Sequence, residues 1–277
     1  MKQDIKVIAM DLDGTALNHQ KQLTERTRSA IQNAAKSGIQ IVVATGRTFS
    51  SLAPEVLAMP EITCAITSNG AVVNRIPDGA VLLHNYPNPE TVSEIAGMIQ
   101  EEEIDTEVCT GGQAYIGQSY YDRVLEGKTN RDVQYVKTTR HPVPDIYQFL
   151  LEHRVAIENI NLNFKTLEEK QQWQQRFQKL PGVTPTSSFL FNVELGGAAT
   201  SKAHALQALL DEWQMTSRQV MAFGDSENDL EMLNMAGTGV AMANAEETVR
   251  RAADLTAESN DRDGVAKVIE DLLKGSV

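Results

Sequence analysis

Cysteine is scarce in this chain: Cys64 and Cys109 are the two among 277 residues. Two thiols are too few for a disulfide framework or for a zinc site built from cysteine. Basic residues are also in the minority, because 25 Lys and Arg face 37 Asp and Glu and give a formal net charge of −12. Nucleic acid and anionic membrane surfaces are bound mainly through Lys and Arg, so neither is an expected partner. A small anionic substrate is still compatible with this balance, since a bound cation can reverse the local charge.

Long apolar runs are absent as well. No stretch approaches the roughly 20 apolar residues that span a bilayer. The chain begins with Met-Lys-Gln-Asp-Ile-Lys and a short apolar run at 7–10, a pattern that does not match a secretory signal. The cytoplasm is therefore the expected location. Hydrophobic residues make up 42% of the composition, which is typical of a folded globular protein.

Short apolar runs alternate with helix-like segments at both ends of the chain. This alternation predicts an α/β fold with a parallel, Rossmann-like sheet between helices. The predicted strands are 7–10, 39–44, 62–67, 219–223 and 239–242, and the predicted helices are 24–37, 50–59, 201–213, 230–236, 246–253 and 265–273.

The middle of the chain has a different order of predicted helices and strands, which indicates a separate α+β unit. We therefore expect a discontinuous core domain, residues 1–83 and 196–277, interrupted by an inserted domain, residues 84–195. Within the insert the predicted helices are 90–102, 144–153 and 167–179, and the predicted strands are 106–109, 114–117, 159–164, 183–187 and 191–195.

Carboxylates follow the ends of two predicted parallel strands. Asp11 and Asp13 come directly after strand 7–10, and Asp225 and Asp229 come after strand 219–223. The carboxyl ends of parallel strands meet at one edge of a sheet, so these carboxylates should converge. Several anions in one place need a cation, and hard oxygen ligands favour Mg²⁺. Taken alone, Asp-x-Asp-Gly is as typical of a turn as of a site, and Asp229 also suits a solvated first helical turn.

Groups suited to phosphate follow two further segments. Thr45, Gly46 and Arg47 end the strand at 39–44, and a hydroxyl, turn amides and a guanidinium can all hold phosphate oxygens. Lys202 opens the first helix after the insert, where it can offset the negative charge. A single lysine is usually a solvated surface charge, so its role depends on the other motifs.

In this order the motifs closely resemble those of the haloacid dehalogenase superfamily of phosphatases. They are Asp-x-Asp-Gly-Thr at 11–15, Thr-Gly-Arg at 45–47, Lys202, and Gly-Asp-Ser-Glu-Asn-Asp at 224–229. Three further segments resemble the Cof-type subfamily, which carries a type IIB cap domain between the second and third motifs. One departure is Gly-Gly-Ala-Ala-Thr before Lys202, where relatives more often carry a proline or other residues. The three segments are Ile-Thr-Ser-Asn-Gly-Ala at 66–71, Gly-Val-Ala-Met-Ala-Asn-Ala at 239–245 and Asp-Gly-Val-Ala at 263–266.

The resemblance implies hydrolysis of phosphomonoesters through an aspartyl-phosphate. Asp11 would be the nucleophile, and Asp13, with a raised pKa, would serve as general acid and then general base. Mg²⁺ would be bound by Asp11, the backbone carbonyl of Asp13 and Asp225, with Asp229 orienting water or Lys202. Thr45 and Lys202 would stabilise the transferring group. The implied substrate-binding residues are Gly46, Arg47, Asn69 and Asn228, although turn formation accounts for the two asparagines equally well.

Two other functions fit the same residues. One is a phosphomutase of the phosphomannomutase type, which shares this fold and cap type, and the other is a non-catalytic metabolite sensor. Asp13 favours hydrolysis, because related ATPases that store the aspartyl-phosphate lack an acid at that place. The expected partner is a small phosphorylated metabolite. The sequence gives no basis for choosing which one, nor for the oligomeric state.

Overall fold

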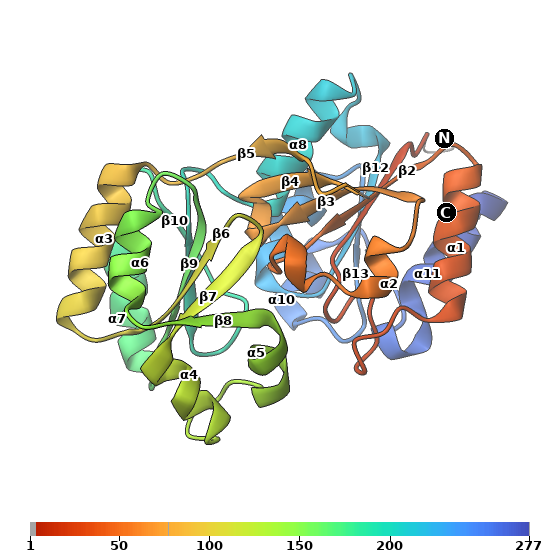
Figure 1. The fold of residues 1–277 in the computed structure, drawn as a ribbon. Coiled ribbons are helices and arrows are strands. Elements are labelled where there is room, and N and C mark those ends of the chain that lie inside the picture. Colours follow the sequence, from red (N-terminus) through yellow and green to blue (C-terminus); the bar gives the residue numbers. More distant parts are fainter. Residues whose placement is uncertain (1–3, 77, 277) are drawn as a thin grey trace. The chain divides into compact units, whose positions relative to one another are not determined.

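The computed structural model describes residues 4–76 and 78–276. Residues 1–3, Pro77 and Val277 belong to the predicted core domain and lie outside the described residues, as does the start of the segment considered as a secretory signal. The chain divides into two compact units, which are described separately (Figure 1). The first unit comprises Met1–Gly46, Leu52–Leu83 and Ser201–Val277, and the second comprises Arg47–Ser51 and His84–Thr200.

The first unit is built on a sheet with the strand order β14-β13-β12-β1-β2-β3-β4-β5. Neighbours from β14 to β3 run parallel, and β4 pairs antiparallel with β3. The predicted α/β class with a parallel, Rossmann-like core is confirmed. The strands are β1 (Val7–Met10), β2 (Gln40–Ala44), β3 (Ile62–Thr67), β4 (Val72–Arg75), β5 (Val81–His84), β12 (Val220–Gly224), β13 (Thr238–Ala241) and β14 (Leu255–Thr256).

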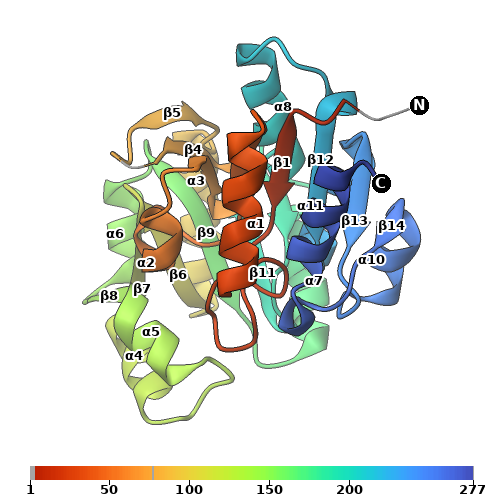
Figure 2. The same ribbon diagram turned by 90° about the vertical axis from the view of Figure 1, so that its right-hand side faces the viewer.

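Helices cover both faces of this sheet, which explains why its central strands are continuous apolar runs. On one face α1 packs beside α11 (Figure 2). On the other face the apolar residues of α8, α9 and α10 join those of the strands in one core cluster. The helices of this unit are α1 (Glu25–Lys36), α2 (Pro54–Leu57), α8 (Lys202–Glu212), α9 (Leu230–Met235), α10 (Glu247–Ala252) and α11 (Gly264–Lys274).

Local sequence signals explain where several elements begin and end. Thr24 caps α1 by accepting a hydrogen bond from the Thr27 amide, and Gly38 follows the helix with a positive φ of 84°. The prediction of one helix over 50–59 is wrong. The chain instead makes a 3₁₀ turn at Phe49–Ser51 and begins α2 at Pro54, whose missing N–H and fixed φ suit the first position of a new helix.

The second unit has a six-stranded sheet with the order β10-β11-β9-β6-β7-β8. One sheet face is apolar and packs on α3, α6 and α7 around residues such as Val108, Ile160 and Val193. The elements are β6 (Asp105–Thr110), β7 (Gln113–Gly117), β8 (Arg140–Val143), β9 (Ile157–Asn163), β10 (Thr184–Thr186), β11 (Asn192–Gly196), α3 (Pro89–Glu101), α4 (Gln118–Leu125), α5 (Val133–Thr139), α6 (Ile146–Glu152) and α7 (Leu167–Phe177).

The boundaries between the two units lie between Leu83 and His84 and between Thr200 and Ser201. The sequence places the second of these boundaries earlier, before residue 196. The segment Arg47–Ser51 also groups with the second unit, which the sequence did not indicate. The roles of the units as catalytic core and cap stay a prediction. Among the described helices, none combines the length and the apolar character that crossing a membrane requires.

Candidate active site

Two neighbouring strands bring the predicted carboxylates to one edge of the large sheet. Met10, the last residue of β1, lies opposite Phe223 of β12 in a parallel register, so Asp11 and Asp225 leave the sheet at the same edge. Carboxylate oxygens of Asp11, Asp225 and Asp229 all lie within 4.8 Å of one another. The convergence expected from the strand ends is therefore present for Asp11, Asp225 and Asp229 in the first unit.

Lys202 joins two of these carboxylates. Its Nζ donates to Oδ1 of Asp11 and to Oδ1 of Asp229, each at 2.7 Å. The lysine is 1% exposed, so it is a buried charge rather than a surface one. A buried ammonium is stable only when it is paired and hydrogen-bonded, and the two carboxylates supply both conditions.

Asp229 is fixed by the turn that precedes α9. Its Oδ2 accepts hydrogen bonds from the backbone amides of Asp225 and Ser226, both at 3.0 Å, while Oδ1 is engaged by Lys202. Gly224 makes room for it, because a Cβ at that position would lie 2.4 Å from the Cβ of Asp229. With both oxygens engaged and the residue fully buried, Asp229 is suited to orienting Lys202 rather than to binding a metal directly.

Asp225 is held from the other side by the turn after β1. The Thr15 hydroxyl donates to its Oδ1 at 2.9 Å. Gly14 has a φ of 82°, and a Cβ there would lie 2.4 Å from Oδ2 of Asp225. Only glycine combines that backbone conformation with so close an approach. The Asn244 side chain donates to the carbonyl of Gly14 at 2.8 Å and so holds the turn in place.

Burial and the neighbouring charges shift the pKa values of the site. Burial raises the pKa of Asp11 well above its ordinary value, Lys202 opposes the rise, and Asp229 and Asp225 add to it. Burial and the nearby Asp229 raise the pKa of Asp225 to about 6. Burial works to lower the pKa of Lys202, but Asp11 and Asp229 outweigh it, so the pKa is raised and the lysine stays charged.

This donor set fits a divalent cation. Asp11 and Asp225 offer hard carboxylate oxygens at short range. Burial raises the pKa of both, and the neighbouring carboxylates add to the rise, so a cation at this place would stabilise their charged forms. Oxygen ligands of this kind suit Mg²⁺ or a similar hard ion, which also keeps positions for water or phosphate.

Asp13 pairs with a lysine from the segment between β1 and α1. Its Oδ1 accepts a hydrogen bond from Lys21 Nζ at 2.7 Å, and its side chain is 35% exposed. An acid that protonates a leaving group must first carry a proton. The raised pKa expected for Asp13 stays a prediction.

The end of β2 and the turn after β3 form an adjoining polar cluster. Thr45 is 1% exposed, and its backbone carbonyl accepts from the Asn69 amide at 3.1 Å. The Asn228 side chain donates to Oδ1 of Asn69 at 3.0 Å, and that oxygen would lie 3.1 Å from a Cβ on Gly46. Four of the predicted phosphate-binding and substrate-binding residues are thus brought together.

Arg47 is the predicted site residue that the structure groups elsewhere. It is the first residue of Arg47–Ser51, which belongs to the second unit. Three polar residues near the carboxylates were not among the predicted site residues: Thr15, Ser226 and Asn244. All three stand within quoted motifs, so the signal was present, but nothing in one sequence tells a structural motif residue from a functional one.

Comparison with known proteins by family model, sequence and structure points to one family. A family model for haloacid dehalogenase-like hydrolases matches residues 8–269. The chain is 31% identical to Phosphatase YwpJ of Bacillus subtilis (strain 168), over 97% of this chain and 100% of that protein. It is 29% identical to the 5-amino-6-(5-phospho-D-ribitylamino)uracil phosphatase YcsE of the same organism, over 96% and 95% of the two chains. A solved haloacid dehalogenase-like hydrolase from B. subtilis superimposes with a TM-score of 0.81 at 30% identity and covers 96% of this chain and 99% of its own.

Proposed function

The chain belongs to the haloacid dehalogenase-like hydrolases, and we propose that it is a Mg²⁺-dependent phosphatase that hydrolyses small phosphorylated metabolites through an aspartyl-phosphate. Family membership was the sequence-based expectation and is confirmed. The observation that carries the proposal is the buried Asp11–Lys202–Asp229 arrangement beside Asp225. It holds a carboxylate in place at the edge of the sheet where open α/β folds bind ligands.

Asp11 is the proposed nucleophile. Lys202 engages Oδ1, so Oδ2 is the oxygen that would attack phosphorus while the bond from phosphorus to the leaving oxygen breaks. Asp13 would deliver a proton to that leaving oxygen. Water would then attack phosphorus and lose its proton to Asp13, while the bond from phosphorus to Asp11 breaks, so that inorganic phosphate leaves and the Asp11 carboxylate is restored.

The surrounding residues have supporting roles in this proposal. Asp11, Asp225 and the backbone carbonyl of Asp13 would hold Mg²⁺, which supplies positive charge that draws an anionic substrate to an acidic site. Asp229 would keep Lys202 aimed at Asp11, and Lys202 and Thr45 would stabilise the charge on the transferring group. Gly46, Arg47, Asn69 and Asn228 would contact the substrate.

The test compares Asp11→Asn with Asp211→Asn, an equally small change on the exposed surface of α8. Free phosphate is measured over a panel of sugar phosphates, pyridoxal phosphate, FMN and nucleotides, with and without Mg²⁺. We expect wild type and Asp211→Asn to release phosphate and Asp11→Asn to release none. Acid quenching of a single turnover should add one phosphate mass to a wild-type peptide containing Asp11.

Undiminished turnover by Asp11→Asn would overturn the assignment. Interconversion of hexose phosphates without phosphate release would indicate a phosphomutase. Metabolite binding by calorimetry with no turnover over the whole panel would indicate a sensor.

A further inference from the structure

The segment Arg47–Ser51 is attached to the second unit, although it follows Thr45 and Gly46 of the first unit without a break. The Ser50 amide donates to the carbonyl of Gly112 at 3.0 Å, in the turn between β6 and β7. The hydroxyls of Thr48 and Ser51 lie 2.9 Å apart, and both residues are buried. This short segment is therefore an ordered part of the second unit, not a loose connection.

The Arg47 side chain has a defined direction within that unit. Its guanidinium donates to the Ser51 carbonyl at 3.0 Å, and its Cζ lies 5.9 Å from the centroid of the Tyr135 ring. A guanidinium within about 6 Å of a tyrosine face is attracted by the negative face of the ring. The ring of α5 thus restricts an arginine side chain that would otherwise sample many rotamers.

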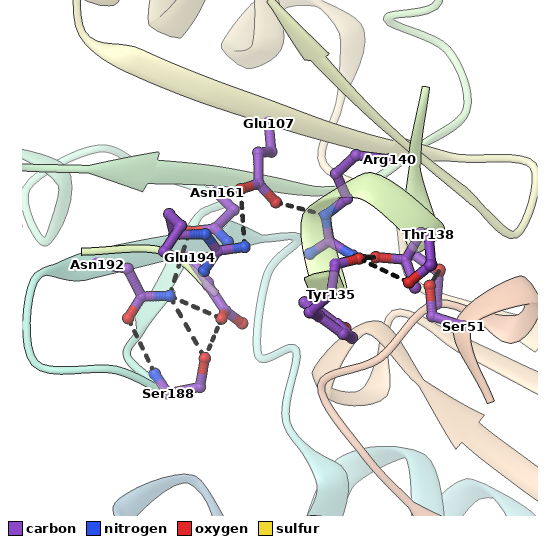
Figure 3. A network of polar contacts seen from close by, with 12 residues as sticks. Ser51, Glu107, Tyr135, Thr138, Arg140, Asn161, Ser188, Asn192 and Glu194 are labelled. Carbon is purple, nitrogen blue, oxygen red and sulfur yellow. Dashed lines mark hydrogen bonds and ion pairs between the residues drawn. The ribbon is translucent and has the colours of Figure 1, made fainter. Parts of the chain in front are cut away.

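Tyr135 is itself held from the interior of the unit. The Arg140 guanidinium lies 4.8 Å from the same ring centroid, and its Nε donates to Oε2 of Glu107 at 2.8 Å (Figure 3). Glu107 is fully buried and also pairs with Arg131, whose guanidinium nitrogen lies 2.8 Å from Oε1. A chain of contacts therefore runs from the buried Glu107 through Arg140 and Tyr135 to Arg47.

We propose that Tyr135 is a positioning residue that orients Arg47 toward an anionic oxygen of the phosphorylated substrate. The inference rests on the proposed function, in which Arg47 contacts the substrate. A guanidinium binds phosphate oxygens best when its N–H groups are already oriented toward them, because less side-chain freedom is then lost on binding. Tyr135 provides this orientation without touching the substrate, and the Glu107–Arg140 pair keeps the ring in place.

The test is a double-mutant cycle with p-nitrophenyl phosphate as substrate and inorganic phosphate as competitive inhibitor. Tyr135→Leu removes the ring, and we expect KM and the inhibition constant of phosphate to rise about 3- to 10-fold while kcat changes less than about twofold. Tyr135→Phe keeps a ring face and should restore values close to wild type. In an Arg47→Ala background, Tyr135→Leu should change KM by less than about twofold, because the group it positions is gone.

Tyr121→Leu is the matched control, because Tyr121 is a partly buried tyrosine of the same unit that packs against the cluster of Ile116, Tyr120, Val124 and Val136. We expect it to leave KM unchanged. Hydrogen–deuterium exchange over residues 47–51 gives a readout independent of activity and should increase in Tyr135→Leu but not in Tyr121→Leu.

Equal effects of Tyr135→Leu with and without Arg47 would overturn the proposal, as would a Tyr135→Phe variant as impaired as Tyr135→Leu. Unchanged exchange over residues 47–51 in Tyr135→Leu would overturn it too. Failure of the proposed function gives a different result. If Asp11→Asn still releases phosphate, the phosphatase assignment itself is wrong. If Asp11→Asn is inactive but the double-mutant cycle shows no coupling between Tyr135 and Arg47, only the positioning role of Tyr135 is wrong.

Discussion

Lys202 and Asp229 form an ion pair at 2.7 Å in which both side chains are almost completely excluded from solvent. The same Nζ lies 2.7 Å from Asp11, so one ammonium is shared between the proposed nucleophile and an anchored carboxylate. Asp229 is in turn fixed by the amides of Asp225 and Ser226. Removing the lysine would therefore affect both the position of Asp11 and the balance of buried charge.

We expect Lys202→Met to lower kcat by about 10²- to 10³-fold, the usual effect of losing one aimed electrostatic contact. The variant should also lose about 3–5 kcal/mol of unfolding free energy, because two buried carboxylates are left without their cation. Stopped phosphate-release assays and urea denaturation measure the two effects. Lys36→Met, on the exposed end of α1, is the control and should change neither. Wild-type kcat in Lys202→Met would contradict the proposed role.

Gly14 gives a test of the cation site that leaves every carboxylate in place. In Gly14→Ala the new Cβ would collide with Asp225 at 2.4 Å, so we expect the affinity for Mg²⁺ to fall at least about 10-fold. Gly38→Ala is a close match, since Gly38 has a φ of 84° but nothing within 4 Å of a new Cβ. It should lose about 1 kcal/mol of stability and keep its Mg²⁺ affinity. The measurement is the shift of melting temperature with Mg²⁺ concentration, and equal behaviour of the two variants would contradict the assignment.

Thr15 offers a pH-dependent test of the same site. Burial and Asp229 raise the pKa of Asp225 to about 6, and the Thr15 hydroxyl works against that rise. Thr15→Val keeps the shape but removes the donor, so the pKa of Asp225 should rise further. Binding of Mg²⁺ requires the charged carboxylate. We expect binding at pH 6 to weaken about fivefold for a rise of about one pKa unit, with the difference disappearing near pH 8. Calorimetric titration with Mg²⁺ at the two pH values checks this, and a loss that is equal at both would argue against titration of Asp225.

Much of the first unit could be predicted because its signals are local. The strands β1, β2 and β3 are buried and mostly apolar, and Thr24 and Gly38 mark the two ends of α1. The position of the carboxylates followed from one further rule, that parallel strands end at the same edge of a sheet. The contact between Lys202 and Asp11 joins residues 191 positions apart, so the order of the motifs was its only signal.

The second unit was harder to predict for physical reasons. The elements α4, α5 and β8 were not predicted, because α5 is seven residues long and β8 is the polar sequence Arg-His-Pro-Val, which lacks an apolar alternation. The attachment of Arg47–Ser51 to this unit depends on contacts with Gly112 and Tyr135, distant in sequence. The partner of Asp13 was missed because Lys21 is exposed, and an exposed lysine has no fixed sequence context.

The last prediction concerns Glu107 and its contribution to the stability of the second unit. It is completely buried between Arg140 and Arg131, at 2.8 Å from each. Burial works to raise its pKa, but the two arginines outweigh burial and hold the pKa below the ordinary value of 4.5. Glu107→Gln keeps the size of the side chain and leaves two buried guanidinium groups without their shared anion. We expect it to lose about 3–5 kcal/mol of unfolding free energy at pH 7.

The pH dependence of this loss follows from the direction of the shift. A carboxylate whose pKa is depressed in the folded state stabilises fully above its unfolded pKa, and its contribution is lost as the pH falls through the lower folded value. The difference between wild type and Glu107→Gln should therefore be constant from pH 8 to pH 5 and shrink below about 4.5. Urea denaturation across this range measures it, with Glu126→Gln, in an exposed pair with Lys128, as the control that should stay within about 0.5 kcal/mol of wild type. A difference that persists unchanged at pH 3 would mean that Glu107 acts through hydrogen bonds that glutamine cannot make, and that its charge does not hold Arg140 beside Tyr135.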